Sequence, residues 1–126
     1  MKVAYLYTGE DNRSHWTDID IPLNDLQRGT RSSPIATTDM LFRESQGDAH
    51  YLELHVAPRR QFILCLSGEV EVACGDGTAR RFGPGDIYLV DDLTGEGHSH
   101  REVRGPLRHA WIGLPDDLDL DAWRVD

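Results

Sequence analysis

The chain has 126 residues and a formal net charge of −9, with 22 acidic against 13 basic side chains. This length fits a single domain with its own hydrophobic core. The acidic balance argues against nucleic acid or an anionic membrane as the main partner, because both attract basic patches.

Short strands separated by turn residues are expected along the chain. In the first half they lie near residues 2–7, 15–21, 37–43 and 49–56, with a polar loop and one helical turn (23–27) inside 22–34. From residue 61 the spacing is regular, and strands are expected at 61–66, 69–73, 78–82, 86–90, 98–104 and 107–113. Many short strands at this pitch predict an all-β sandwich or barrel rather than βαβ units.

Two local signals add to this pattern. Gly75-Asp76-Gly77 is the strongest hairpin signal, because glycine supplies the positive φ that tight hairpin turns need. In the acidic tail, Leu118, Ala122 and Trp123 are available to pack on the strands, and we expect a short C-terminal helix there.

Two cysteines, Cys65 and Cys74, are too few for a disulfide framework. Cys65 stands inside an apolar run, as a small buried hydrophobe does. The first residues are too polar for a secretory segment, and no stretch is long and apolar enough for a membrane span. We therefore expect a cytoplasmic protein with reduced thiols.

Alternation along the strands suggests which side chains share a face, since successive residues point to opposite sides. If His55 faces an interior, Tyr51 and Glu53 do too. The next strand has two parity classes, both largely apolar: Gln61, Ile63 and Cys65 against Phe62, Leu64 and Leu66. The sequence leaves open which class is inward.

The segment from Arg60 to His100 resembles the core of a cupin, and with His55 the resemblance covers about residues 50–113. Cupins carry the motifs G-x5-H-x-H-x3/4-E-x6-G and G-x5-P-x-G-x2-H-x3-N. Here Gly68 closes the first motif and His55 matches its first histidine. In the second motif, Gly83-Pro84-Gly85-Asp86 matches the preceding turn and His98 matches the histidine.

The chain departs from the cupin pattern at four positions. Gln61 stands where the motif has glutamate, the second histidine falls at or next to Ala57, and Glu102 replaces the asparagine. The proline of the second motif is also missing, and residues 91–94 stand in its place. An amide in place of a carboxylate removes a negative charge and weakens binding of a divalent ion.

The resemblance implies an all-β fold, a double-stranded β-helix (jelly-roll) barrel. A single domain would span residues 1–126, with the barrel core at about 50–113. N-terminal strands or an arm would occupy 1–49, and a C-terminal extension 114–126. It also implies a homodimer, a small-molecule ligand in the barrel, and a divalent metal (Zn, Fe, Mn or Ni).

Candidate site residues follow from the motifs and from alternation. The candidate metal ligands are His55, Gln61, His98 and His100. The candidate catalytic residues, which would transfer protons, are Glu53 and His98. The expected pocket lining is Tyr51, Ile63, Cys65 and Tyr88. The alternative for the histidines is a structural, hydrogen-bonded role, and for Glu53 an ion pair with Arg59 or Arg60. Asp91-Asp92 is interpreted as a turn, with an acidic group at the pocket rim as the alternative. His15, His50 and His109 fit no motif spacing and are expected to be structural or exposed, although His109 is on a late strand that could reach the pocket.

Two classes of function remain open. The first is a metal-dependent enzyme of the isomerase, cyclase, decarboxylase or dioxygenase type, acting on a small metabolite. The second is a metal-free module that binds or senses a metabolite, which the changes at Ala57 and Gln61 favour. A third, weaker hypothesis is a metal-independent epimerase or cyclase that uses a His and Tyr pair.

Overall fold

The computed structural model describes residues 1–26 and 29–125, with only the backbone of Leu26. Within these residues the chain forms ten strands and one 3-10 turn: β1 (Lys2–Thr8), β2 (Ser14–Asp20), β3 (Asn24–Leu26), β4 (Gly29–Arg31), β5 (Met40–Ser45), β6 (His50–His55), β7 (Gln61–Cys74), β8 (Ala79–Phe82), β9 (Ile87–Asp91), β10 (His98–Gly113) and η1 (Asp121–Trp123). The described part holds no α-helix, which confirms the predicted all-β class.

Eight of these strands belong to one mixed sheet. Its main order is β2-β1-β9-β7-β10-β5, while β6 pairs with β10 and β8 pairs with β7. The pair β1–β9 is parallel and the other pairs are antiparallel. At the Gly75-Asp76-Gly77 turn the backbone N–H of Cys74 donates to Thr78, which closes the predicted β7–β8 hairpin.

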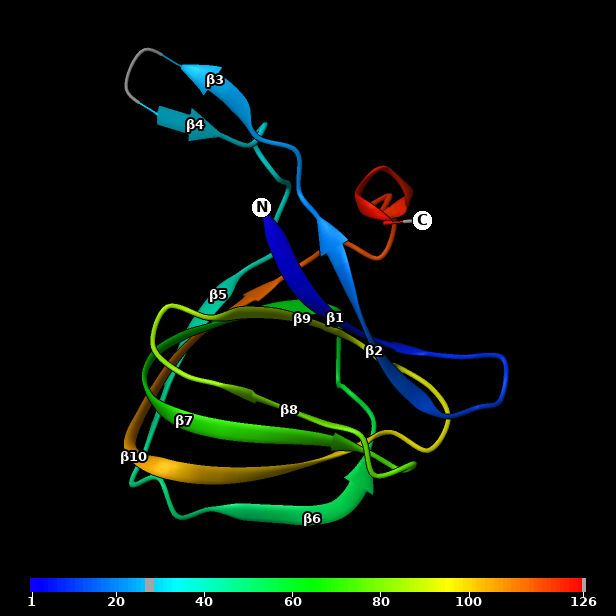
Figure 1. Cartoon of the computed structure of the whole chain (residues 1–126), viewed down its shortest axis with the longest axis vertical. Coiled ribbons are helices and arrows are strands. Elements are labelled where there is room, and N and C mark those ends of the chain that lie inside the picture. The colour runs from blue at the N-terminus through cyan, green and yellow to red at the C-terminus, as the bar shows by residue number, and fades with distance from the viewer. Residues whose placement is uncertain (27–28, 126) are drawn as a thin grey trace.

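Two long strands run through both halves of the sheet, where the sequence suggested four shorter ones. The first residues of β7 pair with β9 and the end of β10, and its last residues pair with β8 and the start of β10. Register shifts between Glu102 and His109 interrupt the β7–β10 ladder where the strands bend. Figure 1 shows the two halves facing each other across this bend.

The inner core lies between the two halves. It combines side chains of β1, β7, β8, β9 and β10, with Leu6, Ile63, Val70, Phe82, Tyr88 and Leu107 among them. On β7, Ile63 and Cys65 belong to this inner core, whereas Phe62 belongs to a second cluster. The parity that the sequence left open is therefore resolved in favour of the class that contains Gln61.

The second core covers the outer face of β1, β2, β7 and β9. Leu114, Leu120 and Trp123 from the C-terminal segment pack there against residues such as Val3, Ile19 and Leu89. The expected C-terminal helix is wrong, because only the three-residue turn η1 forms. Asp has low helix propensity, and four aspartates between 116 and 121 repel one another, so the segment packs on the sheet through turns rather than as a longer helix.

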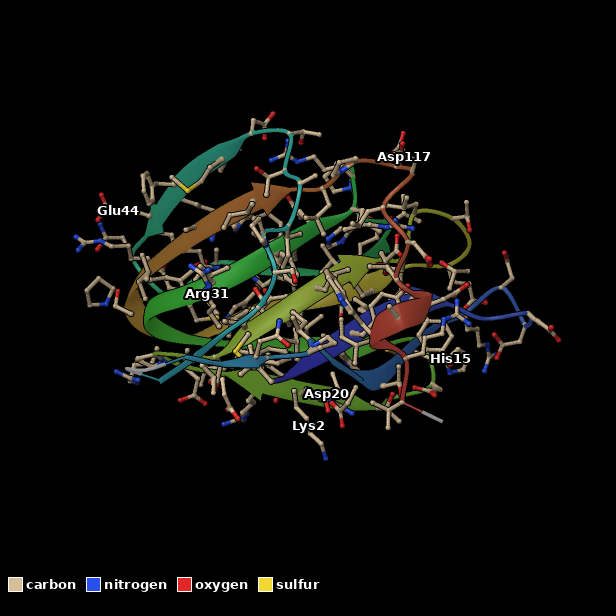
Figure 2. All side chains as sticks on the ribbon, turned by 90° about the horizontal axis from the view of Figure 1, so that it is seen from above. Lys2, His15, Asp20, Arg31, Glu44 and Asp117 are labelled. Carbon is tan, nitrogen blue, oxygen red and sulfur yellow. The ribbon has the colours of Figure 1, made fainter. Side chains whose placement is uncertain are left out.

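The segment before β5 also differs from the expectation. Where a helical turn at 23–27 was expected, β3 and β4 pair as a small antiparallel hairpin, and Gln27 lies outside the described residues. Figure 1 shows this hairpin projecting from the rest of the chain. Charged side chains such as Lys2, Asp20, Glu44 and Asp117 are exposed and lie at the periphery in Figure 2.

Candidate functional site

A small cavity opens between the two halves of the sheet, and four histidines line it. Its volume is about 120 Å³. Strands β6, β7, β9 and β10 and the turn after β6 contribute its walls: His55, Ala57, Pro58, Gln61, Ile63, Val72, Tyr88, Val90, His98, His100, His109 and Trp111. His55 is the exposed member of the histidine group, so we place the mouth of the cavity at this residue.

His98 is held by a buried carboxylate. Asp92, directly after β9, is fully buried, and its Oδ2 lies 2.5 Å from Nδ1 of His98. The hydroxyl of Ser14 donates to the same oxygen at 2.7 Å. Because the carboxylate accepts, Nδ1 of His98 carries the proton and Nε2 keeps its lone pair in the neutral ring.

His55 is oriented in the same way from a different strand. Its Nδ1 lies 3.1 Å from the backbone oxygen of Glu53, an atom that can only accept, so Nδ1 donates and Nε2 keeps a lone pair. His55 and His98 are paired across β6 and β10, and their ring centroids are 4.6 Å apart. The fold thus brings two imidazoles side by side, each with Nδ1 used as a hydrogen-bond donor.

His100 and His109, the other two histidines of the cavity, are uncharged near neutral pH. Burial, together with the positive charge of Arg43, lowers the pKa of His100 to about 4 and that of His109 to about 4. The ring of His100 stacks on Tyr51, with centroids 5.3 Å apart. Arg43 itself pairs with the buried Glu102. These two imidazoles therefore act as hydrogen-bond acceptors or donors rather than as cations.

Polar atoms without partners gather at this cavity. Within the described residues, three buried side-chain nitrogen or oxygen atoms have no hydrogen-bond partner: Nη2 of Arg59, Oδ1 of Asp92 and Nε1 of Trp111. Trp111 lines the cavity, Asp92 bonds to His98, and Arg59 donates to Gln61. Buried polar groups are normally satisfied, and one of these three atoms, the Trp111 nitrogen, belongs to a residue of the lining, which makes the cavity a candidate ligand site.

The candidate residues from the sequence divide into two groups. His55, Gln61, His98 and His100 line the cavity together, as do Ile63 and Tyr88. Cys65 is buried in the same core but outside the lining, and burial raises the pKa of its thiol to about 12. Glu53 and Tyr51 lie on the exposed strand β6 and are not part of the lining.

Sequence reasoning did not select three residues that matter at this site. It did not consider Trp111, it left open that His109 reaches the pocket, and it preferred a turn to a rim acid for Asp92. His109 and Trp111 enter from the far end of β10, and Asp92 positions His98. Asp92 could have been found from the sequence, because it follows an apolar strand and lies six residues before the motif histidine His98.

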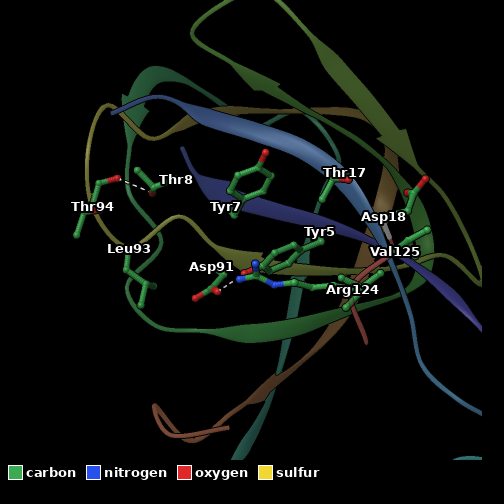
Figure 3. Close-up of a pocket in the computed structure, with 11 residues that line it drawn as sticks. Tyr5, Tyr7, Thr8, Thr17, Asp18, Asp91, Leu93, Thr94, Arg124 and Val125 are labelled. Atoms are coloured by element: carbon green, nitrogen blue, oxygen red, sulfur yellow. Dashed lines mark hydrogen bonds between the residues drawn. The ribbon is translucent and has the colours of Figure 1, made fainter. Parts of the chain in front are cut away.

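A larger surface hollow of about 520 Å³ lies on the outer face of β1 and β2, beside the C-terminal segment (Figure 3). Several of its polar groups already have partners. Tyr5 donates to Asp91 at 2.5 Å, Asp91 pairs with Arg60, and Thr8 donates to Thr94. Burial, then the bond to Asp91, raises the pKa of Tyr5, so this phenol stays protonated. We therefore take the histidine cavity as the candidate site.

The pair His55 and His98 fits a metal ion in part. When two imidazole nitrogens bind one ion at a metal–nitrogen distance of about 2.0–2.1 Å, the ring centroids lie roughly 4.5–5 Å apart. The centroids of His55 and His98 are 4.6 Å apart. In residues 1–26 and 29–125, however, no group of three or more His, Cys, Asp or Glu is arranged to hold a metal. The amide oxygen of Gln61 accepts from Nε of Arg59 at 3.1 Å.

No protein-family model, no curated protein and no solved structure matches this chain. Among the described residues, no helix has the length and apolar character to cross a membrane.

Proposed function

We propose that this chain is a cupin-type protein whose sheet forms a double-stranded β-helix barrel, and that it acts as a metal-dependent enzyme on a small organic metabolite. The oriented pair His55 and His98 carries this proposal, because their ring centroids are 4.6 Å apart and each ring uses Nδ1 as a donor.

His55 and His98 are the residues that would hold the ion. Each has Nδ1 occupied as a donor, by the Glu53 carbonyl and by Asp92, and such outer partners orient histidine ligands in metal sites. Imidazole donors suit Zn, Fe, Mn or Ni. When bound, the ion would polarise a carbonyl or enolate oxygen of the substrate.

The remaining lining residues suit proton transfer in a dry pocket. Ile63, Val72 and Val90 give apolar walls that exclude water. His100 and His109, neutral near pH 7, can accept a proton from a bound substrate. This favours isomerisation, cyclisation or decarboxylation of a small carbonyl compound among the cupin reaction types.

Elemental analysis of protein purified without chelator or affinity tag tests the proposal. We expect stoichiometric divalent metal in the natural chain and loss of that metal in the double variant His55→Ala, His98→Ala. The exposed His50→Ala variant is the control and should keep its metal. A metal-free natural chain that also fails to take up added Zn²⁺ or Mn²⁺ would refute the metal site.

The second candidate is a metal-free protein that binds or senses a metabolite. It is favoured by the missing third metal ligand and by the engagement of the Gln61 oxygen with Arg59. It predicts a metal-free chain whose melting temperature rises with one compound of a metabolite screen, because a ligand that binds only the folded state stabilises it. Loss of that rise in Trp111→Phe would assign the compound to this cavity.

A further inference from the structure

The wall of the cavity at Gln61 and Trp111 offers hydrogen-bond donors. Gln61 is 3% exposed, and its amide oxygen is taken by the guanidinium of Arg59 at 3.1 Å. Because guanidinium can only donate, this bond fixes the orientation of the amide and leaves its NH2 group for other partners. An NH2 group on a cavity wall can donate to an acceptor on the ligand.

Trp111 adds a second donor on the same cavity. Its Nε1 is buried and has no hydrogen-bond partner, although an indole nitrogen can do nothing but donate. Trp16 provides a contrast, since its Nε1 donates to the backbone oxygen of Val72 at 3.2 Å. Leaving such a donor unsatisfied costs about 1–3 kcal/mol, so an acceptor on the ligand would recover this energy.

Two arginines, Arg59 and Arg43, contact the residues that carry these donors. The guanidinium of Arg59 bonds to Gln61 and also keeps an unpartnered buried Nη2. The guanidinium of Arg43 lies over the indole of Trp111, with its carbon 6.0 Å from the ring centroid. Asp39 and Glu102 pair with these arginines from the β5 and β10 sides, yet neither carboxylate belongs to the cavity lining.

The opposite chemistry is found at His55 and His98, whose Nε2 atoms offer lone pairs. The cavity volume is about 120 Å³, so we expect a small ligand.

We propose that the ligand of this cavity is a small carboxylate, whose oxygens accept hydrogen bonds from Nε1 of Trp111 and the NH2 group of Gln61. This inference rests on the proposed function, in that it names the substrate class of the same cavity. Trp111 and Gln61 are the specificity residues, and Arg59 is a positioning residue that holds the amide.

Nuclear magnetic resonance of the indole N–H groups tests this directly in the full chain. The variant Trp111→Phe identifies the Trp111 signal by its loss. Acetate is titrated into metal-free protein, with acetamide as the neutral probe of the same shape. We expect acetate to move the Trp111 signal downfield to saturation, with roughly millimolar affinity as befits four heavy atoms, and acetamide to have at least tenfold less effect.

Two variants complete the test. Gln61→Glu replaces the NH2 donor by a negatively charged acceptor of the same shape. Because acetate is also negative, this variant should bind acetate at least tenfold more weakly. Trp16→Phe, which removes an indole whose N–H is already bonded, should leave acetate binding unchanged. An acetate response that persists in Gln61→Glu, or a Trp111 signal that acetate does not move, would overturn the carboxylate site.

The outcome also separates this inference from the metal proposal. Stoichiometric metal at His55 and His98 without an acetate response leaves the metal site standing and removes the carboxylate site. An acetate response in a chain that binds no metal supports the carboxylate site and removes the metal site. Thermal melts of each variant show that the fold is retained.

Discussion

At the scale of single residues, the site depends on how Asp92 is satisfied. This carboxylate is fully buried, and one of its oxygens accepts from both Ser14 and His98 while the other has no partner. An ionised group in such a position is tolerated only where its hydrogen bonds compensate for lost hydration. The chain keeps it because it fixes the orientation of the His98 ring.

We predict that Asp92→Asn weakens both metal binding and the fold. The amide is a poorer acceptor for Nδ1 of His98, so metal affinity should fall about 10- to 100-fold, as it does when outer partners of histidine ligands are lost. Unfolding free energy should fall by about 1–3 kcal/mol. Metal titration and urea unfolding measure the two effects.

Ser14→Ala is the graded control for this prediction. It removes one donor to Asp92 and leaves the carboxylate on His98, so we expect a smaller loss of metal affinity than in Asp92→Asn. Equal metal affinity in the natural chain and in Asp92→Asn would show that the carboxylate has no part in holding the ion.

His109 predicts a pH dependence of stability. Burial and Arg43 lower its pKa from 6.5 to about 4 in the folded chain. Between these values the unfolded chain binds more protons at this residue, so stability is lost as the pH falls from about 6.5 to about 4. Urea unfolding of metal-free protein at pH 7, 5.5 and 4.5 should show this loss, by a few kcal/mol, and His109→Phe should reduce it.

The exposed His50 supplies the comparison for His109. His50→Phe removes an imidazole outside the cavity and should leave the pH slope as it is in the natural chain. A slope that is the same in His109→Phe and in His50→Phe would contradict the assignment to His109.

At the scale of elements, the bends in β7 and β10 set the shape of the cavity. Gly68 lies at the bend of β7 with a φ of +80°, and a Cβ there would lie 2.7 Å from the backbone oxygen of Arg104 and 2.9 Å from Cα of Leu107. Both neighbours are backbone atoms of β10, so they can give way only if the two strands separate.

We predict that Gly68→Ala destabilises the fold by clearly more than Gly85→Ala. Gly85 has a similar φ of +89°, but nothing lies within 4 Å of its would-be Cβ. The cost at Gly85 is therefore the backbone strain alone, about 1–2 kcal/mol, whereas Gly68 adds the clash with β10. Urea unfolding measures both, and equal losses would mean that the bend tolerates a side chain.

The same bend explains what the sequence could and could not predict. Turn residues act locally, so the hairpin at Gly75-Asp76-Gly77, the histidines beside the turns and most strand positions could be found from the chain alone. His109 and Trp111 could not, because the register shifts in β10 change the parity between His98 and His109. If side chains alternated strictly from His98, the odd-numbered residues of β10 would point away from the cavity. Beyond the bend, however, His109 and Trp111 line it.

At the scale of the whole molecule, one sheet edge is left apolar and uncovered. Strands β5 and β6 follow each other along β10, and within the described residues each pairs with β10 alone. Large hydrophobic side chains are exposed along them: Met40, Leu41, Phe42, Tyr51, Leu52, Leu54 and Val56. An unpaired edge with such side chains is normally covered in a soluble protein, because it invites strand pairing and aggregation.

We predict that two copies of the chain cover this edge by forming a homodimer through β5 and β6. Phe42 is 67% exposed and Leu52 is 64% exposed, which makes them the side chains with most to gain from burial. The double variant Phe42→Lys, Leu52→Lys should be monomeric in light scattering coupled to size exclusion, because lysines on a facing edge repel and stay hydrated. Leu23→Lys, which changes an exposed leucine just before β3, should leave the dimer intact. A natural chain that elutes as a monomer at micromolar concentration would contradict the pairing. A stable dimer needs about 800 Å² of buried surface per copy, and a monomer would mean that this edge does not bury that much.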